Sequence, residues 1–167
     1  MERRYKIFRF AAYSLEFLLL FIIESTPFLL PELFGSKPML LIPAAVTVAL
    51  LEDELPAMFF GLAAGLITDL AIGQSPGFFA LALTPLCFLL ARIFREYMVV
   101  SFLNALAFIS VVTAGLICLY FLFFFVFAGK PNARIYFFNH YISRMIYSIA
   151  CGIPLFYLNK FLYRNLR

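Results

Sequence analysis

The chain has 167 residues, of which 65% are hydrophobic and 13% are charged, and its net charge is +4 at pH 7. Soluble domains carry roughly 25% charged residues, so this composition excludes an ordinary soluble protein and predicts one transmembrane domain over residues 1–167. The basic residues stand at the ends of apolar segments and form no patch interleaved with aromatic residues, which argues against nucleic-acid binding.

Six apolar segments follow one another along the chain. They run from about Phe8 to Leu30, Pro38 to Leu51, Leu55 to Gly73, Gly77 to about Phe94, Val99 to Ala128, and about Tyr136 to Leu158. A straight span needs about 20 residues, so we expect the second segment to be short, shielded or re-entrant, or to thin the bilayer locally. The fifth is long enough to tilt strongly or to extend beyond the bilayer. The sequence thus predicts an all-α protein with a six-helix transmembrane bundle.

Basic residues in the short loops predict the orientation of these segments. With the N-terminus inside, nine lie on the inner side: Arg3, Arg4, Lys6, Arg9, Arg92, Arg95, Lys160, Arg164 and Arg167. Three lie outside, namely Lys37, Lys130 and Arg134. We therefore expect both termini in the cytoplasm. Glu16 interrupts the first apolar segment and Ser25-Thr26-Pro27 is a poor cleavage site, so this segment is read as a retained span, not a signal peptide.

Small residues recur at every fourth position of the third segment, at Ala57, Gly61 and Gly65, and the next step is Asp69. Positions i and i+4 share a helix face, and small side chains let another membrane helix approach closely. The spacing predicts a helix-packing or partner-binding seam that ends in a carboxylate, and we group Gly73 and Gly77 with this seam. Two interpretations of Asp69 stay open: a functional acid on the seam, or a cap on local backbone near the outer end of its helix.

Charged residues also occur inside the predicted spans. Glu24 and Arg144 have opposite signs, and at 1.5 Å per residue both are expected roughly 10–12 Å below the outer boundary. We predict that the first and sixth helices are neighbours and that these two residues form an intramembrane ion pair. The alternative is that Arg144 snorkels outward and Glu24 is protonated. Glu16, offset from Glu24 by about 80°, can also face the bundle interior.

Three further groups of residues have a structural and a functional interpretation. The turn Glu52-Asp53-Glu54 is expected to be solvated, or to bind a basic partner. The run Phe121 to Phe127 covers every face of its helix, which suits contact with lipid or with a partner helix. Cys87, Cys118 and Cys151 are far apart in sequence and read as buried small hydrophobes.

The sequence contains none of the common motifs of enzymes or metal sites. His140 is the sole histidine and has no partner at metal-ligand spacing. Ser75, in the glycine-flanked turn between the third and fourth segments, has no evident general base. We therefore expect a protein that is not an enzyme and needs no cofactor or metal.

The third and fourth segments, in the string FFGLAAGLITDLAIGQSPGFFALALTPL, resemble the rod shape-determining protein MreD family. Gly61, Gly65-Leu66, Asp69, Gly73 and Gly77 carry the resemblance. It implies a multi-pass protein of the bacterial inner membrane that lies beside MreC and supports the cell-wall elongation machinery: the MreB filament, a RodA-type glycosyltransferase and a transpeptidase. It also implies a fold similar to the S-components of energy-coupling-factor transporters.

That fold similarity defines the alternative function, a substrate-binding transporter subunit. Such a subunit needs a cavity with several convergent polar groups. The candidate lining here is limited to Gln74, Asn132, Asn139 and His140, so we favour a non-catalytic scaffold. Whether the chain forms a homodimer stays open.

Overall fold

The computed structural model describes residues 2–26, 37–73, 77–127, 135 and 137–165. Its elements in chain order are α1 (Glu2–Ser25), α2 (Leu41–Leu51), α3 (Glu54–Ile72), α4 (Phe78–Glu96), α5 (Phe102–Phe121), the π-helical turns η1 (Leu122–Val126) and η2 (Phe137–Tyr141), and α7 (Ile142–Asn165). The described residues contain no strand, so the all-α prediction is confirmed for this part of the chain.

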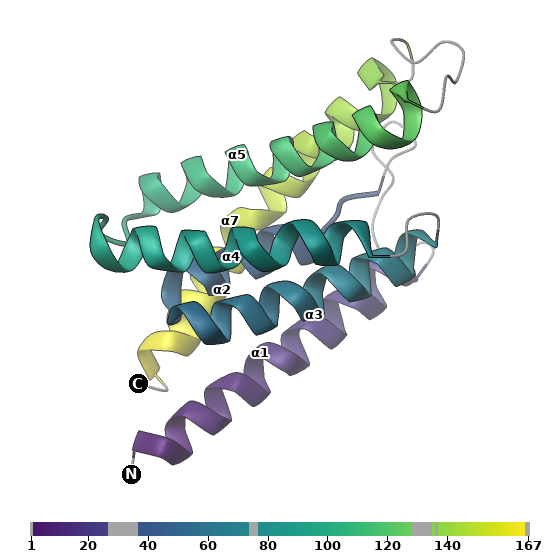
Figure 1. The fold of residues 1–167 in the computed structure, drawn as a ribbon. Coiled ribbons are helices and arrows are strands. Elements are labelled where there is room, and N and C mark those ends of the chain that lie inside the picture. The colour runs from purple at the N-terminus through teal and green to yellow at the C-terminus, as the bar shows by residue number, and fades with distance from the viewer. Residues whose placement is uncertain (1, 27–36, 74–76, 128–134, 136, 166–167) are drawn as a thin grey trace.

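The short helix α2 lies in the middle of the bundle and is enclosed by the others (Figure 1). Ten of its eleven residues are buried, and it contacts α1, α3, α4, α5 and α7. Small side chains such as Ala44, Ala45 and Ala49 let these helices come close to its backbone. At 1.5 Å per residue α2 is about 16 Å long, roughly half the thickness of a hydrocarbon core. The expectation of a short, shielded second segment is confirmed.

Four helical stretches are long and apolar enough to cross a membrane: Glu54–Ile72, Phe78–Glu96, Phe102–Val126 and Phe137–Asn165. The helix α2, with 11 residues, is too short to be a full span, as the length of the second segment predicted. The helix α1 is long enough, but it carries Arg9, Glu16 and Glu24 within one stretch. The result is a six-helix membrane domain in which four helices have the character of ordinary spans.

The fifth segment remains helical to Val126 and ends in the π-helical turn η1. Its phenylalanine run divides between core and surface. Phe124 stacks on the buried Tyr120 with ring centroids 4.7 Å apart, whereas Phe123 and Phe127 are exposed. The run thus contributes both to packing within the chain and to the outer surface.

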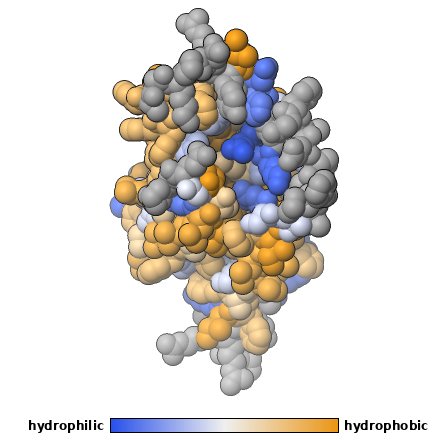
Figure 2. Space-filling view, turned by 90° about the vertical axis from the view of Figure 1, so that its right-hand side faces the viewer, coloured by the Kyte–Doolittle hydropathy of each residue, from blue (hydrophilic) through white to orange (hydrophobic). Residues whose placement is uncertain are grey.

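The helices alternate in direction, so that α1 begins and α7 ends at the same end of the bundle, here called the termini end (Figure 1). The turn between α2 and α3 and the connection between α4 and α5 lie at this end as well. Large apolar side chains cover much of the outer surface; Leu70 and Leu81, for example, are 77% and 78% exposed. Seen from the end opposite the termini, apolar residues cover much of the described surface, and a smaller group of hydrophilic residues lies in the upper part of the view (Figure 2).

We expect reporter domains fused to either end of the chain to report the same compartment, because α1 begins where α7 ends. The distribution of basic residues predicts that this compartment is the cytoplasm. A reporter inserted beside Lys37 should report the other side. Fusions at the two ends that report opposite compartments would contradict the arrangement of helices.

Candidate functional site

The small-residue seam of α3 packs against α4 within the same chain. A Cβ atom added at Gly65 would lie 2.4 Å from the Cα of Ala80, and one at Gly61 would lie 2.8 Å from the Cβ of Cys87. Ala57, in the same register, is fully buried. The prediction of a helix-packing seam therefore agrees with these contacts. Because the seam is already occupied by α4, Gly61 and Gly65 do not offer a surface to another protein.

Asp69 caps the helix that follows it. Its two carboxylate oxygens accept hydrogen bonds from the backbone N–H groups of Phe79, at 3.1 Å, and Ala80, at 3.0 Å. The first N–H groups of a helix have no partner within it, and a negative charge is favourable there. Of the two interpretations left open, the structure supports the backbone cap.

Gly73 and Gly77 do not belong to the packing face, and the prediction that grouped them with it is corrected. Both have positive φ, +66° and +88°, and a Cβ at either would meet open space. Gly73 is the C-cap of α3 and Gly77 is the N-cap of α4. Their role is conformational, because a left-handed backbone favours glycine.

Glu24 and Arg144 interact electrostatically, but the described part of the chain shows no direct ion pair between them, so the predicted contact is not observed. Arg144 Nε donates a hydrogen bond to the carbonyl oxygen of Lys37 at 3.1 Å. The Glu24 carboxyl lies beside the backbone N–H groups of Leu40 and Leu41 at the start of α2. Each side chain therefore meets the polar backbone of the segment that leads into α2 instead of the other side chain.

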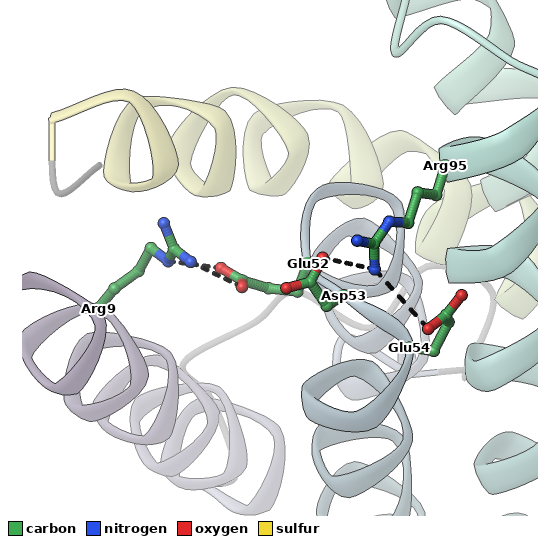
Figure 3. A network of polar contacts seen from close by, with 5 residues as sticks. All are labelled: Arg9, Glu52, Asp53, Glu54 and Arg95. Carbon is green, nitrogen blue, oxygen red and sulfur yellow. Dashed lines mark hydrogen bonds and ion pairs between the residues drawn. The ribbon is translucent and has the colours of Figure 1, made fainter. Parts of the chain in front are cut away.

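The acidic turn between α2 and α3 is held by arginines from two sides (Figure 3). On one side Arg9 of α1 forms a buried ion pair with Glu52, with Nη2 2.8 Å from Oε2. On the other side Arg95 of α4 lies 3.1 Å from Asp53 and 3.8 Å from Glu54. The expectation of a solvated turn holds for the exposed Asp53 but is wrong for Glu52, which is 7% exposed.

The Arg9–Glu52 pair is almost shielded from water. Burial raises the pKa of the Glu52 carboxyl, while the charge of Arg9 acts in the opposite direction. The guanidinium of Arg9 also lies over the ring of Tyr163 in α7, 4.7 Å from its centroid. Breaking one partner of such a pair leaves the other charge buried alone. The pair thus ties α1 to the end of α2 and to α7.

A second buried polar cluster lies further along α1. Asn159 of α7 donates from Nδ2 to Glu16 Oε1 at 3.1 Å and to Thr47 Oγ1 at 2.7 Å. Asn159 and Thr47 are fully buried and Glu16 is 7% exposed. The predicted neighbourhood of the first and last helices is therefore confirmed, although Asn159 and Tyr163 make these contacts and Arg144 does not.

Sequence reasoning missed Arg9, Tyr13, Glu52 and Asn159 as parts of a buried polar site. One signal was available, because Arg9, Tyr13 and Glu16 follow the i, i+4, i+7 spacing of one helix face. Nothing in the sequence indicated the partners on α2 and α7, which lie 43 and 143 residues away.

Other sequence candidates do not form a reactive site in the described residues. Gln74, Ser75 and Asn132 lie outside them. Cys87 is buried against the position of Gly61, and Cys118 is exposed. The described ranges hold no group of three His, Cys, Asp or Glu side chains able to bind a metal ion. What the polar clusters do in this arrangement is fix helices relative to one another.

Comparison with known proteins gives no match to a family model, a curated protein or a solved structure.

We expect Gly65→Leu to abolish folding, since even a Cβ at this position would overlap the backbone of α4. Gly115→Leu is the matched control: Gly115 lies mid-helix in α5, where a Cβ meets nothing within 4 Å. The measurement is the yield of monodisperse protein in detergent and its melting temperature. Equal behaviour of the two variants would show that the α3–α4 seam does not need its glycines.

We expect Arg9→Glu and Glu52→Arg each to lower the free energy of unfolding by about 3–5 kcal/mol, because each leaves two like charges buried together. The double exchange should restore part of this loss. The double exchange Glu24→Arg with Arg144→Glu is the control, and it should restore less, since those two side chains interact through charge but form no direct ion pair. Thermal unfolding in detergent measures both sets; rescue in the control alone would contradict the assignment of the pairs.

Proposed function

We propose that the chain is a non-catalytic scaffold of the bacterial inner membrane, of the MreD type, that associates with an MreC-like single-span protein and the cell-wall elongation machinery to maintain rod shape. The observation that carries the proposal is the α3–α4 hairpin. Gly61 and Gly65 provide its close packing, Asp69 caps α4, and Gly73 and Gly77 end and begin the helices. The residues that carry the resemblance thus act together as one structural unit.

The interior of the bundle favours a scaffold over a transporter subunit. Its centre is filled by α2, whose side chains pack against five other helices. The buried acids Asp69 and Glu52 are occupied by a helix N-terminus and by Arg9. These groups are therefore committed to internal contacts and are not free to converge on a small molecule.

Because the glycine seam is internal, partner helices must use the outward apolar faces of the bundle. In the proposed orientation the termini end faces the cytoplasm, where an MreB filament would meet it. The single-span MreC-like protein, the RodA-type glycosyltransferase and the transpeptidase would meet the lipid-facing sides. A second copy of the chain would compete for the same faces.

We expect the tagged chain, purified from bacterial membranes in mild detergent, to retain an MreC-like single-span protein and to carry no stoichiometric small molecule in native mass spectrometry. The control is Gly115→Leu, a substitution on the outward face of α5 that leaves the internal seams intact and should therefore fold. A bound vitamin-sized molecule in the absence of elongation proteins would overturn the proposal in favour of a transporter subunit.

A further inference from the structure

Glu16 is a carboxyl group in the middle of α1 whose surroundings do not neutralise a negative charge. It is 7% exposed, and it lies well inside the helix Glu2–Ser25, so its carboxyl cannot reach the surface at either helix end. One oxygen, Oε1, accepts a hydrogen bond from Asn159. The other, Oε2, is buried and has no hydrogen-bond partner.

The basic residue on the same face of α1 already has partners. Arg9, two helical turns earlier on the same face, pairs with Glu52 and stacks against Tyr163. From α1 itself Tyr13 also faces this region, with its hydroxyl toward Glu52. From α2 the facing groups are Thr47 and Glu52, and from α7 they are Asn159 and Tyr163.

The helix α3 presents an aromatic ring to this side of α1. Phe60 meets the ring of Tyr13 at 5.5 Å and that of Phe17 at 5.7 Å between centroids. Taken together, the cluster contains one positive group, Arg9, and two carboxyls, Glu52 and Glu16. An ionised Glu16 would leave one uncompensated negative charge in a site nearly closed to water.

A proton on Glu16 removes the uncompensated negative charge, and it also provides a hydrogen-bond donor. A protonated carboxyl gains a donor, and the same cluster holds a buried acceptor without a partner, Asn159 Oδ1. Asn159 is fully buried and already bridges Glu16 to Thr47. A proton on Glu16 therefore supplies a donor to a cluster that holds an unpartnered acceptor.

We propose that Glu16 is a buried proton-binding site and that its occupancy controls how firmly α1 docks on α2 and α7. The helix α1 lies at the edge of the bundle (Figure 1). It is joined to the bundle through the Arg9 and Glu16 clusters, the aromatic contact with Phe60, and the contact of Glu24 with the start of α2. Loss of the proton places a bare charge in the interface between α1 and α7. The free energy of that charge falls when α1 moves away and water enters. Docking of α1 is therefore strong at low pH and weak at high pH.

The test uses the full chain in nanodiscs between pH 5 and pH 9, as wild type, Glu16→Gln, Glu24→Gln and Glu96→Gln. Glutamine keeps the shape of a neutral carboxyl and can still accept from Asn159. Glu96 is an exposed acid that pairs with Arg92 at 3.4 Å, so its variant is the surface control. Hydrogen exchange of α1 peptides, corrected for the intrinsic effect of pH, reports docking. Infrared spectra with labelled glutamate report the protonated carboxyl directly.

We expect the hydrogen exchange of α1 in the wild type and in Glu96→Gln to accelerate about tenfold or more as the pH rises. A tenfold change means that the docked state binds the proton about tenfold more tightly than the undocked state. In Glu16→Gln we expect no such change in the peptides around position 16. Glu24→Gln, which removes the other buried carboxyl of α1, should keep the wild-type response there. A protonated-carboxyl band should disappear over the same pH range in the wild type. A wild-type exchange profile that does not change with pH would overturn the proposal, and so would the same pH response in Glu16→Gln. The measurement is repeated with sodium instead of potassium as the buffer cation. Full protection of α1 at high pH in sodium would also overturn the proposal, because a metal cation and not a proton would then fill the site. Should Glu16→Gln fail to fold, the infrared titration of Glu24→Gln decides, because that variant lacks the other buried carboxyl of α1.

Discussion

The constraint on which the rest of the structure depends is that α2 is too short to cross a membrane and yet lies in the middle of the bundle. A helix leaves unpaired N–H groups at its start and unpaired carbonyl groups at its end, and hydrocarbon cannot satisfy either. The start of α2 falls among other helices, and its end leads into a turn in which Glu52 is buried and Asp53 is exposed. The surrounding helices must therefore shield its apolar sides, and α1 and α7 also provide polar groups near its ends.

The buried polar residues are distributed according to this need. At the entry to α2, Ser148 Oγ accepts from the N–H of Met39 at 2.8 Å, Arg144 donates to Lys37, and Glu24 lies beside the first turn. At its exit, Glu52 pairs with Arg9. Between them, Thr47 receives the amide of Asn159. Polar residues that are scattered along an apolar sequence thus all contact α2 or the segments at its two ends, and together they fix its position.

The association of α3 with α4 also depends on buried polar contacts, here combined with close packing. Two long apolar helices gain little from the hydrophobic effect when they associate in lipid, so they depend on close packing and on polar contacts. Glycines at Gly61 and Gly65 provide the first, and the carboxylate of Asp69 provides the second. The outward faces of the bundle are left apolar, and they are the surfaces by which a scaffold would meet lipid and partner helices.

By itself the sequence determined which stretches are apolar helices, that the second is short for a span, and that Ala57, Gly61 and Gly65 share a packing face. It left open whether Asp69 is a functional acid or a backbone cap. These properties depend on composition and on spacing within a single helix, which the chain displays directly. The tertiary structure alone decided that the seam meets α4, that Arg9 pairs with Glu52, and that Glu24 and Arg144 each turn to the backbone before α2. Matched depth and opposite charge predicted Glu24 and Arg144 as a pair. Backbone groups at the start of the buried helix α2 compete for the same side chains. That competition depends on where α2 lies, which no local pattern encodes.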